Sequence, residues 1–160
     1  MIVVSDTSPI NYLILTGYID VLEELYSHVI IPASVFSELK SQRAPAQIQA
    51  WIAALPGWIE VRSATHDLGL PLDRGEREAI ALAEELNADL LLLDEWRGRS
   101  VAIGRGLAVI GTLGIIERAA DQRLLDLPEA IARLKQTTFH GASALFEKML
   151  ERHAKRRPEK

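Results

Sequence analysis

Two aspartates in this chain of 160 residues follow short apolar runs. Asp6 follows the run Ile-Val-Val at positions 2–4 after one intervening serine, and Asp94 directly follows four leucines at positions 90–93. Continuous apolar runs are typical of strands that are buried on both faces of a parallel sheet. Ligands bind beyond the carboxyl ends of such strands. We therefore expect both carboxylates at a ligand-binding edge of a sheet.

Two further acids, Glu38 and Glu76, lie early in predicted helices that follow a strand or a loop. Right-handed crossovers bring strand ends to one edge of a parallel sheet, so all four carboxylates can meet in one pocket. Like charges packed together repel unless a cation joins them. Oxygen ligands favour Mg²⁺ or Mn²⁺ over zinc. Such a site suits metal-assisted attack of water on a phosphodiester.

The two aspartates differ in how easily a structural role explains them. Ser8 before Pro9 is a helix-start signal that already supplies an N-cap, so capping does not account for Asp6. Asp94 has a structural alternative, because it can cap the helix that begins near Trp96. Its place at the end of a four-leucine strand favours a functional role.

The two glutamates have stronger structural alternatives. Glu76 lies three residues after Asp73, which is the spacing of an acidic version of the capping box. Glu38 has the pattern of an ordinary solvated helix residue. Judged on the residues alone, the structural role is favoured for both.

Apolar periodicity and Gly or Pro breakers divide the chain into alternating elements. The predicted strands are residues 2–4, 28–31, 58–61, 90–93 and 107–110. The predicted helices are residues 11–15, 19–26, 33–40, 46–55, 73–86, 96–105, 113–122, 128–136 and 142–155. This alternation predicts an α/β fold, a three-layer α/β/α sandwich with a mostly parallel central sheet of about five strands.

Composition agrees with one globular domain, at 48% hydrophobic and 25% charged residues. We assign residues 1–140 to the domain itself and residues 141–160 to a C-terminal helix and basic tail. The chain has no cysteine, which excludes disulfides and thiolate metal sites and fits a cytoplasmic location. No apolar run reaches the ~20 residues that a membrane span needs, and the N-terminus lacks a signal-peptide pattern.

Charge is unevenly distributed along the chain. The net charge is −4, but the last nine residues carry +4 and the other 151 carry −8. The basic tail has two interpretations, a contact with phosphates or a frayed, solvated helix end. Closer to the acids, Arg74, Arg97 and Arg99 are candidates for phosphate contacts, with solvated helix surface as the alternative. An exposed Trp96 could stack on a nucleobase.

Five stretches together resemble the PIN domain, and more closely its toxin-like branch related to VapC-type ribonucleases. The stretches are residues 4–10 (VSDTSPI), 31–39 (IPASVFSEL), 75–83 (GEREAIALA), 91–95 (LLLDE) and 109–114 (VIGTLG). They lie in the expected order and span about residues 2–120.

The resemblance implies a PIN-like fold with a catalytic set of Asp6, Glu38, Glu76 and Asp94. We expect Asp6 and Asp94 to anchor Mg²⁺ or Mn²⁺, Glu76 to complete its shell, and Glu38 to orient the attacking water. It also implies three hydrogen-bonding residues near the site, which are Thr7, Ser8 and Thr112. Arg99 stands where this branch tends to carry a basic residue.

The implied activity is that of a metal-dependent endoribonuclease, and the implied biological role is the toxin of a toxin–antitoxin pair. Its expected partners are RNA, a small antitoxin protein and a second copy in a homodimer, with no membrane. The alternative is a non-catalytic PIN-like module that binds an antitoxin or nucleic acid. A phosphatase of the Asp-x-Asp type is disfavoured, because the residues after the first strand are Asp6-Thr7-Ser8.

Overall fold

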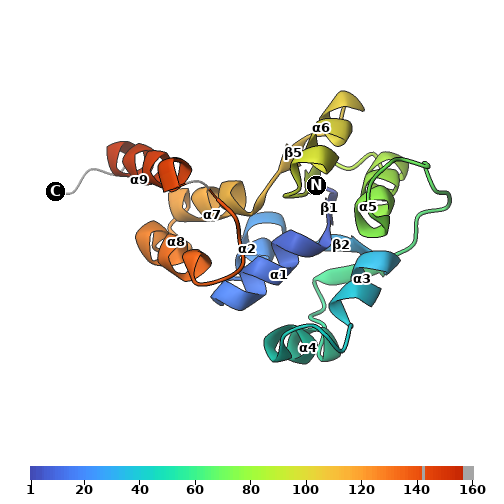
Figure 1. Ribbon diagram of the computed structural model, residues 1–160, viewed down its shortest axis with the longest axis horizontal. Helices are drawn as coiled ribbons and strands as arrows, with labels where there is room; N and C mark the ends of the chain where they lie inside the picture. The colour runs from blue at the N-terminus through green and yellow to red at the C-terminus, as the bar shows by residue number, and fades with distance from the viewer. Residues whose placement is uncertain (142, 157–160) are drawn as a thin grey trace.

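Five short parallel strands form the centre of the protein, in the order β3-β2-β1-β4-β5. The computed structural model describes residues 1–141 and 143–156 (Figure 1). The strands are β1 (Val3–Ser5), β2 (Val29–Pro32), β3 (Ile59–Arg62), β4 (Leu90–Leu92) and β5 (Val109–Ile110). The predicted α/β class and the five-stranded parallel sheet are confirmed.

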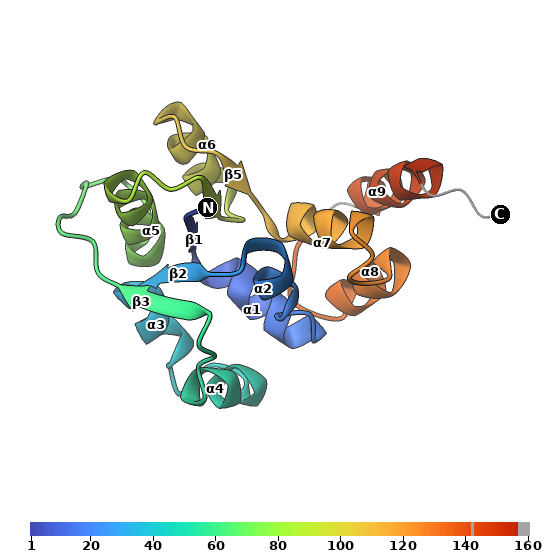
Figure 2. The same ribbon diagram turned by 180° about the vertical axis from the view of Figure 1, so that it is seen from behind.

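Helices connect the strands and cover the sheet on both sides (Figures 1 and 2). Their bounds are α1 (Thr7–Thr16), α2 (Val21–Tyr26), α3 (Ala33–Leu39), α4 (Ala46–Ala53), α5 (Arg74–Glu85), α6 (Trp96–Gly104), α7 (Thr112–Asp121), α8 (Leu127–Lys135) and α9 (Ser143–Arg156). Most lie within a few residues of the predicted ranges.

Successive strand residues point to opposite faces of the sheet, and this produces two hydrophobic cores. Val3 packs in a large core with residues of α1, α7 and α8, whereas Val4 packs in a smaller core with residues of α5 and α6. Leu92 and Leu93 divide between the same two cores. The continuous apolar runs in the sequence therefore reflect strands that are covered on both faces.

The strand order places a topological switch point at β1. From β1 the chain adds β2 and β3 on one side, and β4 and β5 on the other. Crevices that bind ligands in open parallel sheets form at such a point, beyond the carboxyl ends of the two strands that flank it. In this protein those two ends are followed by Asp6 and Asp94.

The start of α1 differs from the prediction. The helix begins at Thr7, so Asp6 and not Ser8 occupies the N-cap position. Ser8 therefore lies inside the first turn, where it is half-buried. The Asp6 side chain makes no capping hydrogen bond.

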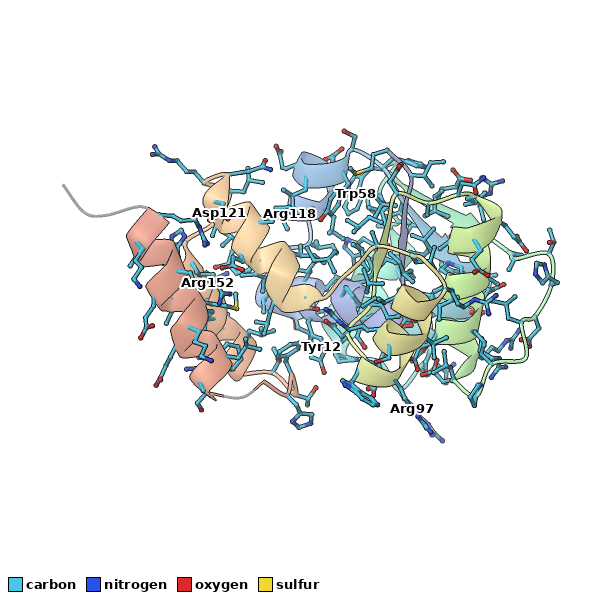
Figure 3. The ribbon with its side chains drawn as sticks, turned by 90° about the horizontal axis from the view of Figure 1, so that it is seen from above. Tyr12, Trp58, Arg97, Arg118, Asp121 and Arg152 are labelled. Atoms are coloured by element: carbon cyan, nitrogen blue, oxygen red, sulfur yellow. The ribbon has the colours of Figure 1, made fainter. Side chains whose placement is uncertain are left out.

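The C-terminal helix α9 packs against α7 and α8. Phe146 and Met149 are buried in the large core, and Arg152 on α9 forms an ion pair with Glu117 on α7 (Figure 3). Position 142, where we predicted this helix to start, and positions 157–160 of the basic tail lie outside the described residues. No helix of the described part has both the length and the apolar character to cross a membrane.

Candidate active site

Asp6 and Asp94 lie at the same edge of the sheet, just beyond the ends of the neighbouring strands β1 and β4. The pairing of β1 with β4 sets Ser5 opposite Leu92. The backbone N–H of Asp6 then donates to the carbonyl of Leu92 at 2.9 Å, which continues the pairing beyond β1. The parallel register, which no short motif specifies, thus brings together two residues that lie 88 positions apart in the sequence.

Asp6 is buried, with only 6% of its surface exposed. Burial is the main cause that raises its pKa to about 7, and the negative charges of Asp73, Glu38 and Asp94 add to the increase. The backbone N–H of Thr7 partly opposes this shift. The carboxyl group is therefore about half protonated at neutral pH unless positive charge compensates it.

Asp94 is held by the N-terminus of α7. The backbone N–H and the hydroxyl of Thr112 each donate to one oxygen of the Asp94 carboxylate, both at 2.6 Å. Desolvation raises the pKa of Asp94, while these two bonds and the nearby Arg99 oppose the increase. The alternative that Asp94 caps the helix after it is wrong, because Glu95 occupies the N-cap position of α6.

Glu76 lies in the first turn of α5, and its backbone N–H donates to the Asp73 carboxylate at 2.9 Å. Of the two hydrogen bonds of the expected capping box, this is the one from the backbone of Glu76 to the side chain of the N-cap residue. The side chain of Glu76 is buried, and its Oε2 atom has no hydrogen-bond partner in the part of the chain that the structure describes. Burial raises the pKa of Glu76 to about 8, and a hydrogen bond to Asp73 and the charges of Asp73, Asp6 and Glu95 add to this.

Glu38 reaches the site from the last turn of α3, and not from early in a helix as predicted. It is exposed there. The hydroxyl of Thr7 donates to its Oε2 atom at 2.7 Å. A Cβ built on Gly75 would stand 3.2 Å from Asp6 Oδ1 and 3.3 Å from Glu38 Oε2, so both carboxylates border this glycine. The structure thus brings together all four acids that the sequence analysis named.

Two more glycines allow side chains of the site to approach the backbone closely. A Cβ on Gly98 would lie 2.5 Å from Glu76 Oε2, and a Cβ on Gly111 would lie 2.8 Å from Asp94 Oδ1. The sequence analysis missed this role. A glycine inside a helix, as at position 98, is the available signal, because it costs helix stability unless packing requires it.

The sequence analysis also assigned Asp73 no role beyond capping, although its charge raises the pKa of both Asp6 and Glu76. Asp73 is the exposed N-cap residue of α5, and nothing in the sequence around it indicates that it lies close to Asp6.

The three candidate arginines are placed differently. Arg99 is half-buried near Asp94 and donates to the carbonyl of Leu93 at 3.3 Å. Arg97 is exposed and extends outward from α6 (Figure 3). Arg74 borders a separate cavity of about 260 Å³ together with Arg77. Of the three, Arg99 is the cation that the structure places beside the acids.

The chemistry of this site fits a hard divalent cation. Its donors are carboxylate and hydroxyl oxygens, the preferred ligands of Mg²⁺ and Mn²⁺. Glu76 has an unpartnered buried oxygen, and burial raises the pKa values of three of the carboxyl groups, those of Asp6, Glu76 and Asp94. Across residues 1–141 and 143–156, no group of three or more His, Asp or Glu side chains already has the spacing of a metal site.

Comparison with known proteins identifies relatives at the level of family and fold. The family model described as "DUF3368: PIN domain" matches residues 2–155. No curated protein matches the chain.

Two solved structures are similar. A PilT N-terminus domain protein, SSO1118 from Sulfolobus solfataricus P2, has a TM-score of 0.51 at 19% identity, covering 89% of this chain and 100% of its own. The PIN domain endonuclease Utp24 has a TM-score of 0.52 at 17% identity, covering 69% of this chain and 84% of its own. At these identities the likeness concerns the fold.

The close approach at Gly98 predicts a large effect of adding one methyl group. We expect Gly98→Ala to destabilise the protein by about 1–3 kcal/mol, because the buried Glu76 carboxylate must move and the new methyl group also crowds Leu93. In a Glu76→Ala background, most of this penalty should disappear. Urea unfolding measures both. Gly104→Ala on the same helix is the control, because open space surrounds it, and it should stabilise by about 0.5 kcal/mol. Equal effects of both alanines would contradict the proposed contact.

The raised pKa values predict how the stability of the chelated, metal-free protein depends on pH. The folded-state pKa values of about 7 for Asp6 and about 8 for Glu76 exceed their ordinary values of 3.8 and 4.5. The folded state therefore binds more protons than the unfolded state between these limits. The free energy of unfolding should therefore fall as pH rises from 5.5 to 8.5. Asp6→Asn should reduce the fall by about 2 kcal/mol.

Urea unfolding in EDTA at a series of pH values checks this prediction. Asp20→Asn is the matched control, because Asp20 is exposed at the start of α2, and its pH profile should follow that of the wild type. If the pH profile of Asp6→Asn also follows that of the wild type, burial does not raise the pKa of the Asp6 carboxyl group.

Proposed function

Because the chain belongs to the PIN domain family, whose members are typically nucleases, we propose that it is a metal-dependent endoribonuclease. It hydrolyses RNA phosphodiesters at the acidic site formed by Asp6, Glu38, Glu76 and Asp94. The observation that carries the proposal is the convergence of these four carboxylates from four separate elements at the β1–β4 switch point.

The electrostatic state of the site supports a cationic cofactor. Burying several carboxyl groups together is costly, since each one disfavours ionisation of the others. A purely structural acidic cluster would be expected to pair with Arg or Lys, yet Glu76 Oε2 is buried without a partner among the described residues. Bound Mg²⁺ or Mn²⁺ would neutralise the cluster, stabilise the charge on the phosphate and lower the pKa of water.

The residues of the chain have distinct roles in this proposal. Asp6 and Asp94 bind the metal ion, and Glu76 completes the metal site. Thr112 holds the Asp94 carboxylate in place through its two hydrogen bonds. Glu38, fixed by the Thr7 hydroxyl, accepts a hydrogen bond from the attacking water and orients it. In this proposal Arg99 and Ser8 contact the substrate phosphate, and both side chains are half-buried.

The proposal predicts cleavage of RNA that depends on these acids. With Mg²⁺ or Mn²⁺, the wild type should cut a labelled RNA, and Asp6→Asn or Asp94→Asn should cut it at least about a hundredfold more slowly. Asp20→Asn serves as the control and should cut normally. Gel analysis of the products gives the rates, and circular dichroism shows that all variants fold.

A calorimetric Mn²⁺ titration separates the possible outcomes. Wild type that binds Mn²⁺ but leaves RNA intact would favour the non-catalytic module. Equal cleavage by wild type and Asp6→Asn would reject the acidic site as the catalytic centre.

The resemblance to the toxin-like branch extends the proposal to a biological role. We propose that the protein is the toxin of a toxin–antitoxin pair, that it acts as a homodimer in the cytoplasm, and that a small antitoxin protein neutralises it. The intact acidic set supports this role, since an RNA-cleaving toxin needs a working catalytic site.

Inducible expression in a bacterial host tests the toxin role. Wild type should arrest growth within a few generations, because unrestrained cleavage of RNA stops protein synthesis, whereas Asp6→Asn should not. Co-expression of a small protein encoded beside the gene should restore growth and co-purify with the wild type. Identical growth of the wild-type and Asp6→Asn strains at equal expression levels would exclude toxicity through this site.

A further inference from the structure

Two neighbouring cavities, of about 390 and 320 Å³, border the acidic site at Asp94. Both are lined by Trp96, Phe139 and His140. Trp96 belongs to α6 and the other two residues to the connection between α8 and α9. The flat side chains of these three residues thus gather next to a carboxylate that we propose binds metal. We call this hollow the aromatic pocket.

Trp96 forms the open wall of the aromatic pocket. It is the first residue of α6, two positions after Asp94, and 75% of its surface is exposed. The rings of Trp51 and Trp58, by contrast, pack together with their centroids 6.4 Å apart. Trp51 is half-buried and Trp58 is buried. An exposed indole beside an active site offers an apolar face that a ligand can cover.

Phe139, a second lining residue of the pocket, is held against the body of the protein. Phe139 packs edge-to-face on Tyr12 of α1, with ring centroids 5.1 Å apart. The Tyr12 hydroxyl lies 3.2 Å from the Thr138 hydroxyl, in hydrogen-bond contact. Figure 3 shows Tyr12 beside the segment that leads from α8 to α9. These contacts preorganise the wall, so little ordering is needed when a ligand binds.

The aromatic pocket continues on both sides into features that suit a polynucleotide. Arg99 lines the larger cavity and supplies a cation close to Asp94. Ser8 lines the smaller cavity and also a third one of about 340 Å³, which contains Glu38 and Arg43. A single strand can therefore pass from Arg43 across the acids to Trp96.

We propose that the aromatic pocket binds one nucleobase of single-stranded RNA, next to the phosphodiester that the acidic site cleaves. The proposal rests on the proposed endoribonuclease function for the identity of the polymer. Bases stack on indole, phenyl and imidazole rings regardless of sequence, and a base must leave its helix to do so. The pocket therefore makes the enzyme specific for unpaired RNA. The volume of either cavity lies in the range of small-ligand sites.

An abasic scan tests the proposal. The probe is a fluorescent 12-nucleotide single-stranded RNA, bound in EDTA by Asp6→Asn protein so that it stays intact. Removing one base at a time should weaken binding about tenfold at a single position and little elsewhere. Adding Trp96→Ala should weaken binding of the intact RNA about tenfold and abolish the effect of the abasic position. Trp96→Phe should retain most of the affinity.

Ile103→Ala is the matched control, because Ile103 is an exposed apolar residue on the same helix, and its affinity should equal that of the parent. A duplex of the same sequence should bind at least about tenfold more weakly than the single strand. Equal binding of duplex and single strand, or an abasic effect that survives Trp96→Ala, would overturn the proposal. So would a change of oligomeric state on Trp96→Ala with unchanged RNA affinity, because the pocket would then contact another copy.

Cleavage of the same 12-nucleotide RNA by the wild type with Mn²⁺ separates this inference from the proposed function. Cleavage without base-dependent binding refutes the aromatic pocket and leaves the nuclease standing. Base-dependent binding without cleavage under any metal supports the pocket and refutes the nuclease.

Discussion

The cost of burying several neighbouring carboxyl groups at one edge of the sheet is the constraint on which the site depends. Asp6 and Glu76 have pKa values of about 7 and 8 because burial and neighbouring negative charge both disfavour ionisation. A protein has no structural reason to retain such an arrangement, since apolar residues of similar size would be more stable there. A bound cation would remove this cost, because its positive charge would neutralise the buried carboxylates.

The rest of the fold keeps these groups in place. Two hydrophobic cores fix the sheet between its helices, and the parallel register then determines where the strands end. The helices that begin at this edge contribute their first turns to the site: Asp6 and Thr7 from α1, Glu76 from α5, and Thr112 from α7. Backbone N–H groups at helix N-termini favour nearby negative charge, and the Thr112 N–H bonded to Asp94 is the direct example. Glycines at positions 75, 98 and 111 leave room for the side chains to meet.

Much of this arrangement could be predicted from the sequence. Apolar runs separated by amphipathic helices indicate the strands and helices, since burial on one or two faces determines the residue pattern. The acids after residues 2–4 and 90–93 were predictable for the same reason, because they follow strands. The start of α1 was predicted wrongly: Ser8 and Pro9 resemble a cap and first turn, but the helix extends back to Thr7 and leaves Asp6 at the N-cap position.

The sequence by itself determined the fold class, the strand ends and the identity of the four acids through their resemblance to a known family. Only the tertiary structure decided that Glu76 is buried with an unpartnered oxygen, that Thr112 holds Asp94, and that Asp73 adds its charge to the cluster. It also decided that Phe139 and His140 line the same cavities as Trp96, which lies more than 40 residues earlier in the chain. Local patterns record which face of an element is buried. Contacts between distant elements depend on strand order, register and helix packing, which no short stretch of sequence encodes.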